Sequence, residues 1–120
     1  SQINQPALIF GEMGDAAGLF ACAPEDGNFR VFYDALQSSV VEVEFFDADH
    51  FDFADSTSCL PCGFCQQGDA DDAMVKLVTR RTLVAFLRYH LLGEVVMETY
   101  LTGDGIGSGV EAGLIAVRQK

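Results

Sequence analysis

The sequence predicts an α/β domain in which a parallel sheet is flanked by helices, and three observations support this fold class. Residues 7–10 (ALIF) are apolar at every position, which is typical of a strand buried on both faces of a parallel sheet. Residues 40–46 (VVEVEFF) form a second candidate strand, and a helical pattern lies between the two runs. Strand, helix and strand in this order predict parallel strands joined by a crossover helix.

The first region, residues 1–46, is expected to contain this strand-helix-strand unit. Asn28 can cap the helix, because its side-chain oxygen can accept a backbone N–H of the first turn. The apolar positions that follow at helical spacing are Phe29, Phe32, Tyr33 and Leu36. In the second strand Glu42 and Glu44 share one face, so this strand is expected to have a wetter face at the edge of the sheet.

The second region, residues 47–70, is acidic and rich in cysteine and lacks steady periodicity, so it is interpreted as a long loop. Four aspartates begin it, at positions 47, 49, 52 and 55. Their spacing matches no calcium-binding loop, and they are expected to be mostly solvated charge.

The third region, residues 71–102, is expected to be helical. Asp71 and Asp72 suit the N-terminus of a helix over 71–92, and Gly93 suits its end. The apolar stripe of this helix is expected to be Leu77, Val84, Leu87 and Leu91, with the arginines 80, 81 and 88 lying off it. A second short helix is expected over residues 94–101.

The fourth region, residues 103–120, is interpreted as a glycine-rich tail that ends in a candidate last strand at residues 113–117. The glycines of residues 103–109 are expected to break regular structure. Two or three strands make a marginal sheet alone. The sequence therefore indicates a domain that is incomplete as a single chain or that another chain completes.

Composition excludes several classes of function. The chain has 120 residues, 49% of them hydrophobic, which suffices for a packed core. Its 7 basic and 18 acidic residues give a formal charge of −11, which would repel nucleic acid and anionic lipid head groups. No apolar stretch approaches the roughly 20 residues that a membrane span needs. We therefore expect neither a nucleic-acid partner nor a transmembrane segment.

Two candidate catalytic residues follow the predicted strands. Asp15 lies five residues after the first strand, and His50 lies just after the second. Active groups in parallel sheets gather on loops that leave the carboxyl ends of the strands. In a nucleophilic hydrolase, a carboxylate orients an imidazole, which takes the proton of the nucleophile and returns it to the leaving group. Each residue also has a structural interpretation, as a turn aspartate or a partly buried histidine, and His90 on the long helix is expected to be structural.

The four cysteines form a second constellation. Cys59, Cys62 and Cys65 are spaced Cys-x-x-Cys-x-x-Cys, and Cys22 is remote. This spacing can ligate zinc or an iron-sulfur cluster, but no second short-spaced pair supports a metal, so disulfides are the favoured use. Three pairings remain open. Disulfides would favour an oxidising compartment, secreted or periplasmic.

Several motifs together resemble the last third of an α/β-hydrolase of the chlorophyllase and cutinase-like polyesterase group. They are residues 11–15 (GEMGD), 22–28 (CAPEDGN), 32–36 (FYDAL), 49–51 (DHF) and 84–89 (VAFLRY). The resemblance extends over about residues 6–102. It implies a serine esterase with a Ser-Asp-His triad and no cofactor, which acts on a small-molecule or lipid-like ester.

Within this resemblance, His50 matches the general base. Asp15 matches the triad acid of the polyesterases, whereas the chlorophyllase pattern implies an acid upstream of this chain. Phe51 and Phe53 would line an apolar pocket beside the base, although aromatic residues at such positions are more often core. No Gly-x-Ser-x-Gly nucleophile motif is present, since residues 105–109 (GIGSG) have the wrong spacing and no preceding strand. The serine is therefore expected on a missing N-terminal part of the same hydrolase. The alternative is a cysteine-rich metal-binding or interaction module without catalysis.

Overall fold

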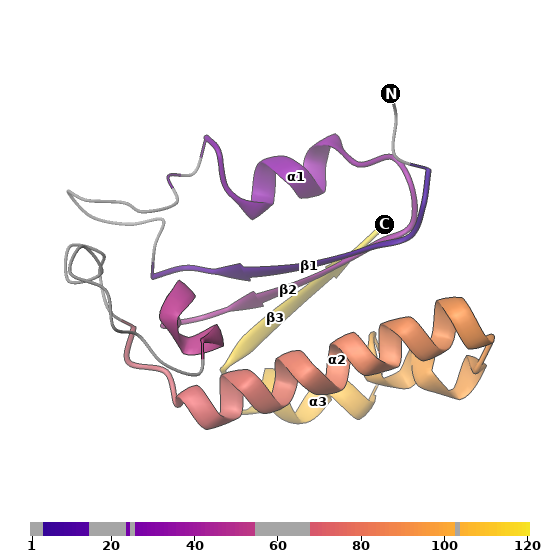
Figure 1. Cartoon of the computed structure of the whole chain (residues 1–120). Helices are drawn as coiled ribbons and strands as arrows, with labels where there is room; N and C mark the ends of the chain where they lie inside the picture. The colour runs from indigo at the N-terminus through magenta and orange to yellow at the C-terminus, as the bar shows by residue number, and fades with distance from the viewer. Residues whose placement is uncertain (1–3, 15–23, 25, 55–67, 103) are drawn as a thin grey trace.

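The structure, a computed structural model, describes residues 4–14, 24, 26–54, 68–102 and 104–120. Its elements in chain order are β1 (Ala7–Glu12), α1 (Phe29–Ala35), β2 (Val40–Phe45), the 3-10 helix η1 (His50–Phe53), α2 (Asp72–Leu92), the 3-10 helix η3 (Val95–Tyr100), α3 (Asp104–Glu111) and β3 (Ile115–Gln119). Helix α1 covers one face of the sheet, and α2 and α3 cover the other (Figure 1). The described part of the chain is thus a small mixed α/β domain with three layers.

The sheet has the strand order β1-β2-β3 and is mixed. Strands β1 and β2 are parallel, from the pair Ala7 and Val40 to the pair Glu12 and Phe45, as the sequence predicts. Strand β3 is antiparallel to β2, so the prediction of a parallel sheet is only partly right. Helix α2 carries the chain away from the end of β2 and α3 carries it back on the same face, as Figure 1 shows. The chain therefore re-enters the sheet at the carboxyl end of β2, and β3 runs antiparallel to β2.

Strand β2 is the central strand, so the prediction that it lies at a sheet edge is wrong. Glu42 is 0% exposed and Glu44 is 7% exposed, because α1 covers this face and two arginines reach the carboxylates. Arg118 of β3 donates to Glu42 Oε1 from Nε at 2.7 Å and from Nη2 at 2.6 Å. Arg30 of α1 donates to Glu44 Oε1 from Nη2 at 2.8 Å. In β2, alternation of apolar and acidic residues therefore belongs to a strand that is buried on both faces.

The opposite face of β2 contributes to the apolar core. Val41, Val43 and Phe45 pack with Val75 of α2 in one cluster. Ile106 of α3, Ile115 of β3 and Ala48 complete the buried part of that cluster. On the α1 side, Phe29 and Tyr33 are buried as expected, whereas Phe32 is 60% exposed. Asn28 caps α1 as predicted, because its Oδ1 accepts the Arg30 N–H at 3.0 Å.

Helix α2 has the predicted ends but not the predicted buried face. Asp71 Oδ1 accepts the N–H groups of Ala73 and Met74, and Gly93 ends the helix in a left-handed conformation with φ of 69°. The buried residues are Val75, Thr82 and Ala85. The predicted stripe is exposed, at 55% for Leu77, 52% for Val84, 44% for Leu87 and 74% for Leu91. Apolar side chains surround much of this helix, so periodicity alone could not select the face that meets the sheet.

The prediction that residues 103–109 break regular structure is wrong, because α3 spans most of them. Gly109 is buried where α3 meets β3, and a Cβ atom there would lie 2.9 Å from Ile115 Cδ1. A glycine at this position allows the helix to approach the strand closely, which compensates for its low helix propensity. Within the described ranges no helix is both long and apolar enough to cross a membrane.

Candidate functional site

The loops that leave β1 and β2 touch each other at the carboxyl ends of the two strands. The Met13 N–H donates to the Phe45 carbonyl at 3.1 Å, and the Gly14 N–H donates to the Ala48 carbonyl at 2.9 Å. A Cβ atom on Gly14 would lie 2.5 Å from the Ala48 oxygen, so a larger residue would push the two loops apart. Backbone hydrogen bonds therefore hold residues 13–14 against residues 45–48, and this pair of segments is called the bonded edge below.

His50 begins η1 directly after this edge, two residues beyond Ala48. Its side chain is exposed, and its ring lies 3.8 Å from the Phe51 ring between centroids, at an angle of 45°. An exposed imidazole at the end of a buried strand can exchange protons with a bound molecule. The position thus meets the first geometric requirement for a general base, which is access to the reacting group.

Two buried aspartates fix the backbone that carries His50. The Asp49 side chain accepts the Phe51 N–H at 2.6 Å from Oδ1 and the Gly68 N–H at 2.8 Å from Oδ2. Asp52 Oδ2 accepts the Asp49 N–H at 2.8 Å, which completes a capping box around η1. Asp49 is 3% exposed and Asp52 is 6% exposed, so the expectation that these aspartates are solvated charge is wrong.

Burial raises the pKa of the Asp52 carboxyl, and the nearby charges of Asp49 and Asp72 raise that pKa further. The hydrogen bond from the Asp49 backbone acts in the opposite direction and lowers it. Asp72 lies at the start of α2, and its side chain hydrogen-bonds with the Asp52 carboxyl. Asp52 therefore supports the turn and binds a proton more readily than an ordinary aspartate does.

Of the two aromatic residues beside His50, the structure places Phe53 in the core. Its ring meets the Phe45 ring edge-on, with centroids 5.4 Å apart and an interplanar angle of 84°. Phe51 is partly exposed and contacts the imidazole. His90 is half-buried on α2 and lies against the rings of Phe86 and Tyr89.

Several predicted residues lie outside the described part of the chain. Asp15 follows Gly14 directly but is not among the described residues, and neither are the four cysteines. The described residues contain no group of three or more histidine, cysteine or acidic side chains arranged to hold a metal ion. The disulfide interpretation and the metal-binding alternative therefore both stay predictions.

The segment 105–109 lies within α3 and follows the 3-10 helix η3. A nucleophile elbow needs a strand before its serine and a helix after it. Residues 105–109 therefore do not form a nucleophile elbow, which agrees with the position of Ser108 in this segment, since it differs from the Gly-x-Ser-x-Gly spacing. Comparisons with protein-family models, curated proteins and solved structures find no match to this chain.

Proposed function

We propose that the chain is the C-terminal part of a carboxylic ester hydrolase of the α/β-hydrolase type. In this proposal His50 is the general base, and the serine nucleophile lies on an N-terminal part outside residues 1–120. The observation that carries the proposal is the bonded edge of residues 13–14 and 45–48. It brings the chain just before Asp15 beside the chain just before His50, at the carboxyl ends of neighbouring parallel strands.

The proposed reaction needs one proton carrier. The His50 imidazole takes the proton of the serine hydroxyl as its oxygen attacks the ester carbonyl, and a tetrahedral intermediate forms. The imidazolium then gives this proton to the departing alcohol, which leaves an acyl-enzyme. Water is activated by the same imidazole and releases the acid. Asp15, or a carboxylate upstream of this chain, would orient the ring and stabilise its charged form.

The two edges of the sheet support a second part of the proposal, that the N-terminal part adds a strand beside β1. Strand β3 ends at Gln119 and is followed directly by Lys120, and a lysine at the end of an edge strand discourages further pairing. Strand β1 is apolar from residue 7 to residue 10. Among the described residues it pairs only with β2, so its other side remains available to a partner strand.

The test compares the 120-residue chain with the natural protein that contains it. Intact mass of the purified protein, together with any co-purifying chain, first establishes what the natural protein is. We expect the natural protein to hydrolyse a nitrophenyl ester and the 120-residue chain alone to show no turnover, since the base then has no serine to activate. In the natural protein, His50→Ala should lower kcat at least about 1,000-fold.

His90→Ala is the matched control, because it removes the other histidine from a half-buried position on α2 and should leave kcat within about twofold, as expected for a group outside the reaction. Asp15→Asn tests which carboxylate orients the base, since a large loss of kcat assigns that role to Asp15. Turnover by the 120-residue chain that His50→Ala abolishes would contradict the proposal. So would full activity of the natural His50→Ala protein.

A further inference from the structure

A groove of about 450 Å³ lies between α2 and η3, away from His50 and its loop. Its apolar walls are formed by Leu77, Val84 and Ala85 of α2 and by Met97 of η3. Polar groups also line it, namely Tyr100 and the three arginines 80, 81 and 88. The groove is shallow and open to solvent.

The charge of this groove is opposite to that of the chain. The chain has a formal charge of −11 and only 7 basic residues, of which three line the groove. Arg88 is paired with Glu94 at 2.6 Å. The Arg81 guanidinium stacks over the Tyr100 ring at 4.9 Å and forms no ion pair with any described residue. Stacking covers one face of the guanidinium and leaves its N–H groups able to donate in the plane.

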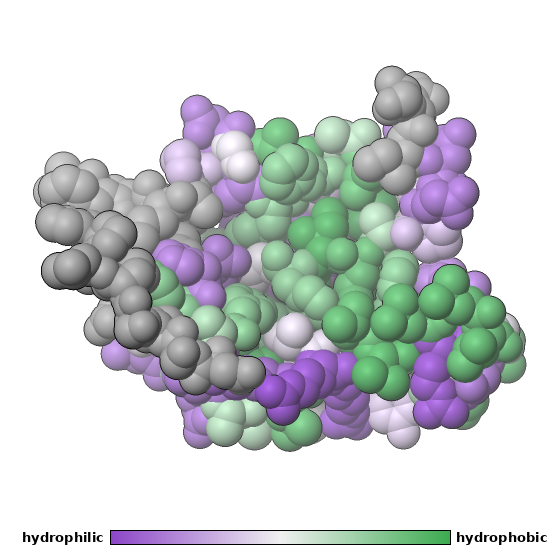
Figure 2. Space-filling view, viewed as in Figure 1, coloured by the Kyte–Doolittle hydropathy of each residue, from purple (hydrophilic) through white to green (hydrophobic). Residues whose placement is uncertain are grey.

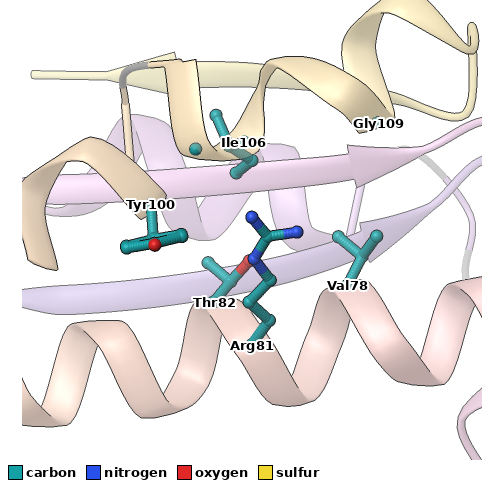
Figure 3. Close-up of a pocket in the computed structure, with 7 residues that line it drawn as sticks. Val78, Arg81, Thr82, Tyr100, Ile106 and Gly109 are labelled. Atoms are coloured by element: carbon teal, nitrogen blue, oxygen red, sulfur yellow. The ribbon is translucent and has the colours of Figure 1, made fainter.

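Arg81 and Tyr100 also line a narrow crevice next to the groove, and Figure 3 shows them there with Thr82 and Val78 of α2 nearby. This crevice has a volume of only about 10 Å³ and is also lined by Ile106 and Gly109 of α3. That space is about the size of one water molecule, so a larger ligand would be held on the outer side of Arg81.

The apolar surface continues beyond the groove to the turn between α2 and η3. There Leu91, Leu92, Val95 and Val96 are 61–74% exposed. Figure 2 shows apolar side chains gathered over this end of α2. An apolar surface of this extent next to cationic groups indicates a ligand that has both an apolar and an anionic part.

We propose that the groove binds a single-chain amphiphile with an anionic head, of which a long-chain fatty acid is the type. The carboxylate accepts hydrogen bonds from Arg81, and the alkyl chain lies on Leu77, Val84 and Met97. A charged guanidinium bound to a carboxylate forms stronger hydrogen bonds than a neutral pair does. This site is independent of the proposed esterase activity, because it uses neither His50 nor a serine.

A second copy of the chain fits the groove poorly. If two α2 helices paired along the stripe of Leu77, Val84 and Leu91, the arginines of one copy would face those of the other. Like charges that face each other across a helix pair are unfavourable. The arginines of the groove therefore favour an occupant that brings negative charge.

The test is calorimetric titration of the natural protein that contains residues 1–120 with dodecanoate below its micelle concentration. Hexanoate has the same head with a shorter tail, and dodecyltrimethylammonium has the same tail with a cationic head. We expect saturable binding of one dodecanoate per chain, with each comparison ligand at least about tenfold weaker, because both burial of the tail and pairing of the head contribute.

Neighbouring substitutions on α2 localise the site. Val84→Glu places a carboxylate in the groove and should abolish binding, whereas Leu83→Glu should leave it unchanged because Leu83 does not line the groove. The two residues are 52% and 42% exposed, so neither substitution is expected to unfold the chain, which circular dichroism checks. Arg81 lines the groove, so Arg81→Gln should weaken binding about fivefold. Lys76 does not line it, so Lys76→Gln should leave binding unchanged.

Equal affinity for dodecanoate and the cationic amphiphile would overturn the proposal, and so would equal effects of the two glutamate substitutions. Failure to bind dodecanoate at all would overturn it as well. If a synthetic acidic amphipathic helix binds at Val84 while dodecanoate does not, the groove is a protein-docking surface instead. None of these outcomes bears on the nitrophenyl-ester assay, so the two proposals fail separately.

Discussion

The two faces of the central strand β2 are both buried but are stabilised by different interactions. On the α2 side, Val41, Val43 and Phe45 are buried in a continuous apolar cluster. On the α1 side, the buried carboxylates of Glu42 and Glu44 are each paired with an arginine from another element. Burial on the first face is favourable without any partner, whereas burial on the second face depends on each charge finding its partner.

This difference shows that alternating charge in a strand does not by itself indicate solvent. Arg118 lies 76 residues beyond Glu42, so the pair forms only once β3 has joined the sheet. Arg118 also lies over the Tyr33 ring at 4.6 Å, which connects α1 to the same pair. The polar face of β2 is therefore assembled from three distant segments, and the apolar face needs only side chains of the right size.

The largest expected effect comes from the apolar face. Phe45 is fully buried and packs against the rings of Phe10 and Phe53. Phe45→Ala should lower the free energy of unfolding by about 3–5 kcal/mol, because it removes apolar contacts and leaves a cavity. Urea unfolding followed by circular dichroism measures the change.

Phe46→Ala is the matched control for that change. Phe46 follows directly and is 39% exposed, so its removal should lower the free energy of unfolding by about 1 kcal/mol or less. Similar losses for the two variants would show that the face of β2 toward α2 is not the core of the domain.

A smaller effect is expected from the paired face. Arg118→Met keeps most of the side-chain volume but leaves the Glu42 carboxylate buried without its cation. The arginine is 43% exposed, so we expect the free energy of unfolding at pH 7 to fall by about 2–3 kcal/mol, somewhat less than for a fully buried pair.

The pH dependence gives this prediction a sharper form. Burial raises the pKa of Glu42 above its ordinary value of 4.5, and Arg118 opposes that rise. Without Arg118 the pKa of Glu42 rises further, so the folded variant takes up a proton as the pH falls and no longer buries a charge. The deficit relative to wild type should therefore shrink as the pH falls from 7 through the raised pKa toward 4.5. A deficit that is constant from pH 7 to pH 4.5 would show that the loss comes from packing alone.

The smallest effect is expected at the second pair. The side chain of Arg30 is 37% exposed and that of Glu44 is 10% exposed, so the carboxylate of Glu44 keeps some contact with water after Arg30 is removed. Arg30→Met should lower the free energy of unfolding by about 1 kcal/mol or less. A loss as large as that of Arg118→Met, measured by the same urea titration, would contradict the dependence on burial proposed for the two pairs.

Local patterns were sufficient to predict most elements of the fold. Asn28 and Asp71 mark helix starts because their side chains accept N–H groups of the turn that follows, and Gly93 marks an end. The helix α3 was missed because its glycines read locally as breakers, whereas Gly109 serves close packing against β3. The sequence pattern also predicts the wrong buried face for α2, because apolar residues lie on both the exposed and the buried face of this helix.

In the candidate site, too, local patterns predict some features, and contacts between distant residues decide others. The exit of β2 at His50 could be predicted from the strand pattern and the loop that follows. The capping box of Asp49 and Asp52 is also local, since its hydrogen bonds span at most three residues. The bond from the Gly68 N–H to Asp49 could not be predicted, because Gly68 lies 19 residues away. The groove between α2 and η3 could not be predicted either, because Met97 and Tyr100 come beside the arginines 80, 81 and 88 only in the folded chain.

The sequence by itself determined the positions of the caps, which follow from interactions within a few residues. It also determined the α/β class and the parallel pairing of β1 and β2, because strand, helix and strand in this order favour a crossover connection. Only the tertiary structure decided the reversed direction of β3, the central position of β2 and the face of α2 that meets the sheet. Each of these depends on contacts between distant segments, such as that between Glu42 and Arg118. No local periodicity encodes such a contact, since it exists only when the chain has folded.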